Sequence, residues 1–292
     1  MIAETELAQL HQEVEQALER GDEGDLRVIG WGEISLGVGW PTEHPEHVAK
    51  RLPVFPDEAS FGRYAALVEE YAEELGRRGI RVLETDLRSL PRPDGTLAGY
   101  AVQPVLPAGT LGPAVLRGAD PGDGHPLIEL IVERTLEIVS QPLGLDPQVS
   151  NWSWSGGEAT YFDVTTPFMR GAGGEDRMDF GLLLAGFPWA LRGLLRRFVA
   201  PSIIAQFHDA RTVIVDVCGN LKKERLEGWI TPVLELANPR LDEPVSQSDV
   251  DDYYRSDART WGLIQRVRRA DRAWHRLTGR TYPFLLPGEI ER

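Results

Sequence analysis

The stretch that decides the fold runs from Leu143 to Pro167 and reads LGLDPQVSNWSWSGGEATYFDVTTP. Its centre, WSWSGGEATYF, alternates on both sides of Gly156-Gly157, which is typical of a β-hairpin. Asp146 and Asn151 precede this hairpin in a proline-containing loop, and Asp163 follows its second strand. Asn151 and Asp163 therefore lie at the two ends of one short hairpin, and we expect their side-chain oxygens to converge.

These three polar residues are candidates for a metal-assisted reaction. Two hard oxygen ligands and one free carboxylate are what magnesium-assisted phosphoryl transfer requires. Asp and Asn are also common turn formers. The triplet alone therefore does not separate a catalytic site from ordinary turns, and matching residues are needed elsewhere in the chain.

Composition limits the class of protein. With 292 residues, 42% hydrophobic and 26% charged, the chain is long enough for one large or two small domains. No apolar run approaches the ~20 residues of a membrane span, and the acidic N-terminus is not a signal peptide. The single cysteine, Cys218, excludes an internal disulfide framework and fits a cytoplasmic protein. It lies in an apolar run, which predicts a core position.

The net charge of −14 comes entirely from the first half of the chain. Residues 1–150 hold 12 basic and 26 acidic side chains, whereas residues 151–292 hold 19 of each. This distribution argues against nucleic acid or an anionic membrane as a partner. A cationic substrate or peptide stays open, beside the simpler explanation that the acidity keeps the protein soluble.

The chain uses arginine almost wherever it uses a cation. Lys50, Lys222 and Lys223 are its only lysines, so Lys50 stands alone in the first 221 residues. A compact ammonium and a planar guanidinium are not equivalent in a tight phosphate site. A phosphate-binding role for Lys50 would therefore explain why a lysine is retained at this position.

A glycine-containing turn precedes Lys50. The segment LRVIGWGEISLGVGWP, from Leu26 to Pro41, predicts two strands joined through Gly30 and Gly32. Backbone N–H groups approach phosphate oxygens closely only where side chains are small, and Ser35 would add a hydroxyl. The third strand, HVAKRLPVF, then carries Lys50 about fifteen residues after this turn.

The order of glycine turn, lysine, then Asp146, Asn151 and Asp163 resembles the protein-kinase-like superfamily, closest to its aminoglycoside and choline kinase branch. The resemblance implies an ATP-dependent phosphotransferase in which Asp146 is the catalytic base or orients the acceptor hydroxyl. Asn151 and Asp163 would bind Mg²⁺, and Lys50 would hold the α- and β-phosphates. The acceptor would be a hydroxyl of a small molecule or peptide.

The resemblance also implies the rest of the nucleotide site. Gly30, Gly32 and Ser35 would lie over the phosphates. The helix predicted over residues 58–78 would supply a glutamate to pair with Lys50, for which Glu69, Glu70, Glu73 and Glu74 are candidates and Glu70 has the best mid-helix position. Backbone groups between Gln103 and Pro107, around Val105, would meet the adenine ring.

The fold implied is α+β and bilobal, with a small antiparallel-sheet N-lobe, one main helix and a mostly helical C-lobe. Residues 1–25 would form an N-terminal helix, residues 26–107 the N-lobe and residues 108–292 the C-lobe. Residues 126–140 predict the central helix of the C-lobe, and the sequence is expected to be helical from Asp179 onward. A last helix would begin at Ser248-Asp249, bury a stripe of large apolar residues and present its arginines to solvent. The members of that stripe are Trp261, Ile264, Val267, Trp274 and Leu277.

Two departures from the kinase pattern leave alternatives open. Gly144-Leu145 replaces the usual residues before the first aspartate, and Val164-Thr165 replaces the Phe-Gly after the last. A pseudokinase that binds nucleotide or acts as a scaffold is one alternative, and a helical binding module with coincidental spacing is another. The chain is similar to an uncharacterised actinobacterial family in its arginine, glycine and proline content and in its NWSW and KKERL segments. This similarity implies no activity. The loop carrying His44 and His47 is poor support for zinc, since no cysteine or third ligand lies near.

Overall fold

The computed structural model describes residues 2–31, 36–179, 181, 204–278, 282 and 285. Gly32 and Ser35, both predicted to lie over the phosphates, fall outside these residues, as does most of the apolar helix expected after Asp179.

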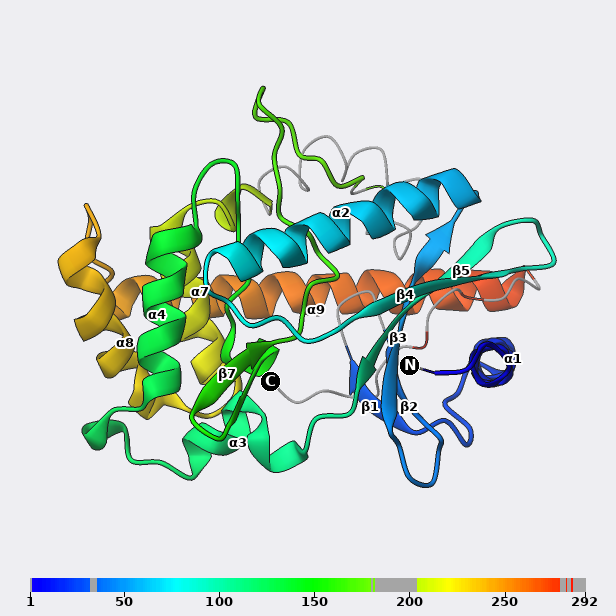
Figure 1. The fold of residues 1–292 in the computed structure, drawn as a ribbon, viewed down its shortest axis with the longest axis horizontal. Coiled ribbons are helices and arrows are strands. Elements are labelled where there is room, and N and C mark those ends of the chain that lie inside the picture. The colour runs from blue at the N-terminus through cyan, green and yellow to red at the C-terminus, as the bar shows by residue number, and fades with distance from the viewer. Residues whose placement is uncertain are drawn as a thin grey trace.

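The N-terminal part is built on a five-stranded antiparallel sheet in the order β1-β2-β3-β5-β4. Helix α2 connects β3 to β4 and lies along the sheet (Figure 1). The strands are β1 Val28–Trp31, β2 Leu36–Trp40, β3 His47–Phe55, β4 Asp86–Pro91 and β5 Leu97–Pro104, and the helix is α2 Glu58–Arg77.

The remainder is mostly helical, apart from the hairpin of β6 and β7, which lies between the sheet and the helices (Figure 1). Its strands are β6 Trp152–Ser155 and β7 Glu158–Tyr161. The helices are α3 Gly112–Arg117, α4 Pro126–Ile138, α7 Ala210–Lys223, α8 Ile230–Ala237 and α9 Gln247–Leu277, with α1 Glu4–Arg20 preceding the sheet. Short 3-10 turns cover Ala108–Thr110, Pro121–Asp123, Val149–Asn151, Glu227–Trp229 and Asn238–Arg240.

The predicted fold class is confirmed: an antiparallel sheet with one main helix is followed by a mostly helical region. This α+β arrangement is consistent with the bilobal kinase-like fold that the resemblance implied. The helices predicted over residues 4–20, 58–78 and 126–140 correspond to α1, α2 and α4, because the apolar spacing in each generates one buried face.

The alternation of β3 sends neighbouring side chains to opposite sides of the sheet. Ala49 is fully buried in a hydrophobic cluster with α1, and Arg51 on the same side pairs with Glu15 of α1 at 2.7 Å. Lys50 therefore faces the other side, toward the hairpin. A second and larger cluster joins α2, the hairpin and the C-terminal helices, so the sheet lies between two separate apolar layers.

Helix α2 is held in place at its start and along one face. The Asp57 side chain caps the helix by accepting a hydrogen bond from the Ser60 backbone N–H at 2.7 Å. Such a cap stabilises a helix by about 1 kcal/mol. The buried face faces the second cluster and consists of Tyr64, Leu67, Val68, Tyr71 and Leu75. Two of these tyrosines matter for the site.

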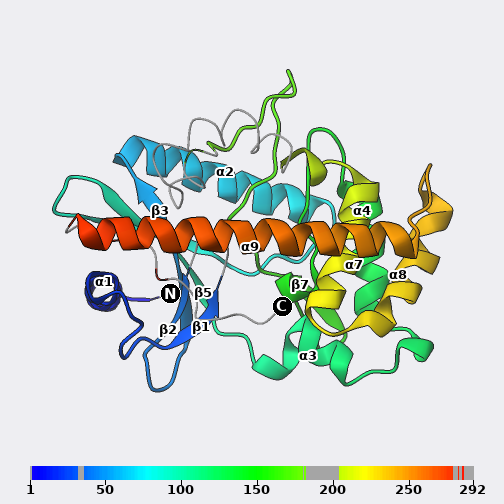
Figure 2. The same ribbon diagram turned by 180° about the vertical axis from the view of Figure 1, so that it is seen from behind.

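Helix α9 runs across almost the whole width of the molecule (Figure 2). Its cap is Ser246, which exchanges hydrogen bonds with Asp249, rather than the predicted Ser248. The apolar stripe predicted for it is also partly wrong, because Trp274 and Leu277 are 58% and 82% exposed. The helix outruns the C-terminal core there and passes beside the sheet.

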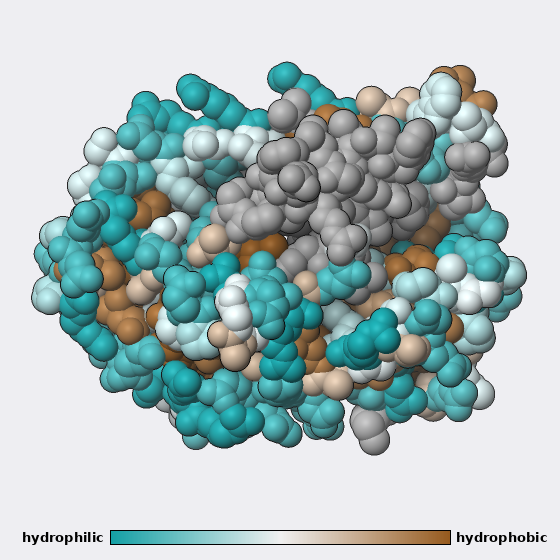
Figure 3. Space-filling model, turned by 90° about the horizontal axis from the view of Figure 1, so that it is seen from above, coloured by the Kyte–Doolittle hydropathy of each residue, from teal (hydrophilic) through white to brown (hydrophobic). Residues whose placement is uncertain are grey.

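On the face seen from above, the residues that Figure 3 colours are mainly hydrophilic, with hydrophobic areas between them. Among the described residues, no helix combines the length and apolar character needed to cross a membrane.

Candidate active site

The centre of the candidate site is a contact between the sheet and the hairpin. Lys50 Nζ donates to Asp163 Oδ1 at 2.8 Å and to Thr165 Oγ1 at 2.6 Å. The Thr165 hydroxyl in turn donates to Asp163 Oδ1 at 3.0 Å. The two charged side chains are 26% and 30% exposed, so the pair is partly desolvated yet open to solvent on one side.

The environment of Asp163 favours its charged form. Burial raises the pKa of this carboxyl, but the Lys50 ammonium and the hydrogen bonds from Lys50 and Thr165 lower it more, so the pKa lies below its usual value. At neutral pH the site therefore presents a carboxylate to any cation that enters.

This shift predicts a pH-dependent contribution to stability. Because the folded-state pKa of Asp163 is below the unfolded one, its ionisation stabilises the fold above the unfolded pKa, and this is lost as pH falls through the folded pKa. We expect wild type to be more stable than Asp163→Asn at pH 7 and the gap to shrink toward about pH 3. Thermal unfolding of both proteins across this range measures the gap. A constant gap would contradict the assignment of this charge.

The hairpin places Asn151 and Asp163 at the same end, one just before its first strand and one just after its second, as the sequence predicts. Trp152 pairs with Tyr161 in register, and the Phe162 backbone N–H then donates to the Asn151 carbonyl at 3.0 Å. The turn between the strands is made by Gly156 and Gly157, both with positive φ, a conformation that glycine adopts without strain.

Asp146 is tied to the same hairpin through its backbone. Its carbonyl oxygen accepts from Asn151 Nδ2 at 3.1 Å and from the Tyr161 hydroxyl at 3.1 Å. Its carboxylate accepts from the Gln148 backbone N–H at 3.4 Å. The structure thus brings Asp146, Asn151 and Asp163 to one end of the hairpin, where Lys50 bonds to Asp163.

The donor set of this group fits magnesium in chemical type. The amide nitrogen of Asn151 is used by Asp146, so its amide oxygen is the atom left for an ion, and Asp163 adds carboxylate oxygens. Magnesium prefers hard oxygen ligands and commonly takes one or two from protein and the rest from phosphate and water. Across residues 2–31, 36–179 and 204–278, no cluster of three or more His, Cys, Asp or Glu side chains forms a metal cage. Two oxygen donors therefore suit a metal shared with a phosphate-bearing substrate.

A row of small residues lies beside Lys50 on the sheet. Lys50 pairs directly with Gly37 on β2 and Ala101 on β5, and Gly37 pairs with Gly30 on β1. Directly paired residues place their side chains on the same face. A Cβ on Gly30 would meet nothing within 4 Å. Gly30 is exposed, whereas Gly37 and Ala101 are buried, so the room for a ligand on this face lies at the Gly30 end of the row. Of the residues predicted over the phosphates, Gly30 lies in this row.

The predicted pair of Lys50 with Glu70 is not formed. Glu70 instead makes a two-pronged ion pair with Arg177, at 2.6 and 2.7 Å, on the outer side of α2. The hydrogen bond from Arg177 lowers the pKa of Glu70. Lys50 meets Asp163 and Thr165 in place of a glutamate from the helix.

Helix α2 reaches the site through tyrosines instead. The Tyr64 hydroxyl donates to the Thr165 carbonyl at 2.8 Å, and the Tyr71 hydroxyl donates to the Gly144 carbonyl at 3.0 Å. Both side chains are buried, and burial raises the pKa of each phenol, so both stay protonated donors. One helix thus holds the segments that carry Asp163 and Asp146.

Gly144 explains one departure from the kinase pattern. A Cβ at this position would lie 2.6 Å from the Phe207 carbonyl oxygen and 2.9 Å from Phe168 Cβ. The rings of these two phenylalanines stack with centroids 4.2 Å apart. The larger residue usual here has no space, because two aromatic segments close over the chain.

We expect Gly144→Ala to destabilise the protein by about 1–3 kcal/mol, because the backbone oxygen of Phe207 must move. The measurement is the loss of thermal stability. Gly62→Ala is the matched control, since a Cβ there meets nothing within 4 Å and alanine favours a helix. Equal stability of Gly144→Ala and wild type would show that this packing is not tight.

The connection after the sheet differs from the prediction in one respect. The Val105 backbone N–H, expected to meet an adenine ring, donates to the Glu46 carbonyl at 2.9 Å and continues the ladder between β3 and β5. Gln103, predicted in the same contact, donates from Nε2 to the Phe162 carbonyl at 2.7 Å and to Thr85 Oγ1 at 2.8 Å. Gln103 therefore ties the sheet to the hairpin.

A cluster of buried polar side chains, which the sequence analysis did not predict, supports the loop that carries Asp146. Gln148 donates from Nε2 to Asp216 at 2.9 Å and accepts from Asn220 at 3.1 Å, and Tyr253 donates to Asp216. Burial raises the pKa of Asp216. The sequence contained one hint, a charged residue within the apolar run TVIVDVCGN. In the same helix Cys218 is buried, as predicted, and burial raises its pKa to about 12.

Fold and site together define the class: an α+β protein with an antiparallel-sheet N-terminal region, a mostly helical C-terminal region, and a Lys-Asp contact between sheet and hairpin. The chain belongs to a family of unknown function (DUF6206), which matches residues 9–272. No curated protein sequence matches the chain significantly. A solved structure, the GDP complex of wild-type aminoglycoside 2'-phosphotransferase-IIIa, is similar at 11% identity with a TM-score of 0.33. The match covers 79% of this chain and 97% of that one, and is too weak to transfer any role.

Proposed function

We propose that this protein is an ATP- and magnesium-dependent phosphotransferase that moves a γ-phosphoryl group to a hydroxyl. The observation that carries the proposal is the 2.8 Å contact between Lys50 Nζ and Asp163 Oδ1. It joins a cation from the sheet, 113 residues away in sequence, to the oxygen donors at the end of the hairpin. A cation facing hard oxygen ligands is the charge pattern that a metal-bound triphosphate requires.

Each residue would have a separate task. Lys50 would neutralise phosphate charge beside the open position at Gly30. Asn151 and Asp163 would hold magnesium, which when bound would offset the negative charge of the phosphates. Asp146 would orient the acceptor hydroxyl and accept its proton.

The proposed reaction needs only these groups and two substrates, ATP and the acceptor. The bond between the γ-phosphorus and the oxygen of ADP breaks, a bond from the acceptor oxygen to phosphorus forms, and the acceptor proton passes to Asp146. The segment between Asp163 and Asp179, where a substrate would be presented, is short for binding an extended peptide. This favours a small-molecule acceptor.

A second candidate is a protein that binds nucleotide without turnover. It is favoured by Thr165, which replaces the usual glycine. Its hydroxyl bonds to both Lys50 and Asp163, while its carbonyl is held by Tyr64. To contact both Lys50 and Asp163, a nucleotide would have to displace this hydroxyl. In a protein without turnover, the arrangement in which Thr165 bonds to both charges would be the stable one.

Two measurements separate the candidates. Thermal unfolding with ATP, with and without magnesium, tests binding, and we expect stabilisation that requires both. ATP consumption over a panel of hydroxyl compounds then tests transfer. Binding with no turnover on any acceptor would support the second candidate, and no stabilisation by any nucleotide would reject both.

A further inference from the structure

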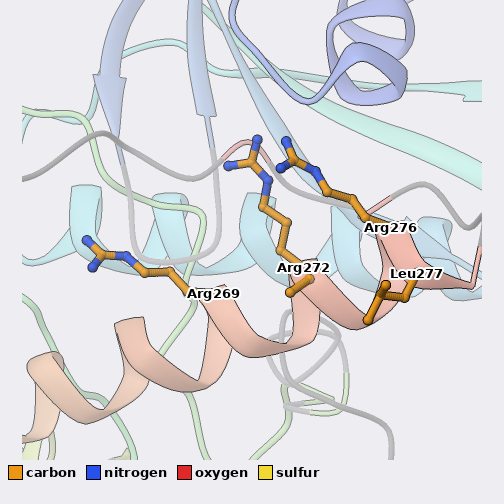
Figure 4. Close-up of a pocket in the computed structure, with 5 residues that line it drawn as sticks. Arg269, Arg272, Arg276 and Leu277 are labelled. Atoms are coloured by element: carbon orange, nitrogen blue, oxygen red, sulfur yellow. The ribbon is translucent and has the colours of Figure 1, made fainter.

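Three arginines of α9 lie on one face of the helix, in the part that passes beside the sheet (Figure 2). Arg269, Arg272 and Arg276 are spaced by three and four residues, which places them on successive turns of the same side. Figure 4 shows their side chains extending to that side. With Ala273 and Leu277 they line an open cavity of about 520 Å³, a size typical of small-molecule sites.

The charge of this arginine cluster is poorly balanced. Arg269 and Arg276 are exposed and form no hydrogen bond or ion pair with the part of the chain that the structure describes. Arg272 donates to the Gly21 carbonyl. Burial lowers the pKa of Arg272, the charge of Arg276 lowers it further, and Asp22 opposes the shift. Like charges have therefore been brought together, and Asp22 is the carboxylate that acts on Arg272.

A purely architectural role explains only part of this arrangement. Gly21 ends α1, and a cation at the C-terminus of a helix is favourable, so Arg272 attaches α9 to α1. That single bond uses one of the five donors of a guanidinium. Within the described residues, Arg269 has no such contact. The chain has 45 acidic residues, yet none of those that the structure describes forms an ion pair with any of these three arginines.

We propose that Arg269, Arg272 and Arg276 form a binding site for a soluble ligand that carries two or more phosphate groups. Guanidinium groups bind phosphate through paired, charge-assisted hydrogen bonds. Seven residues of α-helix separate Arg269 from Arg276, roughly 10 Å along the axis. One phosphate cannot contact both ends of this row, whereas a ligand with several can.

The test uses tripolyphosphate and isothermal titration calorimetry. All proteins carry Lys50→Met, so that a phosphate chain bound at the candidate active site does not contribute. Removing two guanidiniums with Arg269→Gln and Arg276→Gln should weaken binding at least about tenfold. Arg272 is kept because it attaches α9 to α1. Thermal unfolding confirms that the double variant keeps its fold.

Arg259→Gln is the matched control, because Arg259 is exposed on the same helix about 15 Å from Arg269 and does not line the cavity. Its affinity for tripolyphosphate should stay within about twofold of the parent. Unchanged binding in the double variant, or an equal loss in Arg259→Gln, would overturn the proposal. Binding to phosphoinositide vesicles but not to tripolyphosphate would assign the cluster to a lipid headgroup and also overturn it.

Discussion

Lys50→Met is expected to abolish magnesium-dependent ATP binding while the protein stays folded. Methionine is unbranched like lysine and one atom shorter, and it removes the ammonium that faces Asp163. Losing one preorganised charge contact of this kind costs roughly 10²–10³-fold in turnover. ATP titration followed by thermal unfolding measures binding, and ATP consumption measures turnover.

The fold should survive this change because the neighbours of Lys50 stay bonded. Asp163 keeps its hydrogen bond from Thr165, and Thr165 is held by Tyr64 from α2. Leaving the carboxylate without its cation costs about 1–3 kcal/mol, which a domain of this size withstands. Circular dichroism would confirm an intact fold.

A second lysine offers a matched control. Lys223 also pairs with an aspartate, Asp257, at 2.9 Å, and is similarly protected from solvent, but it lies at the end of α7. Lys223→Met should change stability by a comparable amount and leave ATP affinity as in wild type. If Lys50→Met bound ATP as tightly as Lys223→Met, the assignment of Lys50 to the phosphates would be wrong.

The parts of the fold set by neighbouring residues could be predicted from the sequence. Gly156 and Gly157 supply the positive φ values that a tight hairpin needs, so the position of Asn151 relative to Asp163 followed from local pattern alone. Likewise, alternation along β3 determines that Lys50 faces away from α1. Helices α1, α2 and α4, each with one apolar face, were predicted to within two residues.

Contacts between distant segments were not predictable in the same way. Glu70 has the best mid-helix position, but Arg177, 107 residues later, takes its carboxylate. Tyr64 and Tyr71 looked like ordinary apolar-face residues, because their hydroxyl bonds depend on where the carbonyls of Thr165 and Gly144 come to lie. The periodicity of a helix shows which residues are buried and does not show which polar atoms they meet.

The same limit explains the error in α9. Its apolar spacing continues to Leu277, and a regular spacing predicts a regular buried stripe. Of the described residues in this helix, the C-terminal core includes only Val250 and Tyr253 at its start, and Trp274 and Leu277 at its far end are exposed. The extent of a core is a property of the whole chain.

Asp146→Asn is expected to remove phosphoryl transfer and leave ATP binding unchanged. The residue is attached through its backbone carbonyl, which accepts from Asn151 and Tyr161, and these bonds do not depend on its side chain. Asparagine also keeps an oxygen for the Gln148 backbone N–H. The substitution thus removes a negative charge and a proton acceptor with little change in shape. Loss of a general base reduces turnover by typically 10²–10⁴-fold.

Asp120→Asn is the control for this change, because Asp120 also accepts the backbone N–H two residues onward, from Gly122 at 2.8 Å, and is bonded to none of Lys50, Asn151 and Asp163. Both variants should show the stabilisation by ATP and magnesium that wild type shows, and only Asp146→Asn should lose turnover. Equal turnover in the two variants would remove Asp146 from the chemistry. If wild type itself bound ATP and consumed none with any acceptor, the contact of Thr165 with Lys50 and Asp163 would then account for a site that holds nucleotide without reacting it.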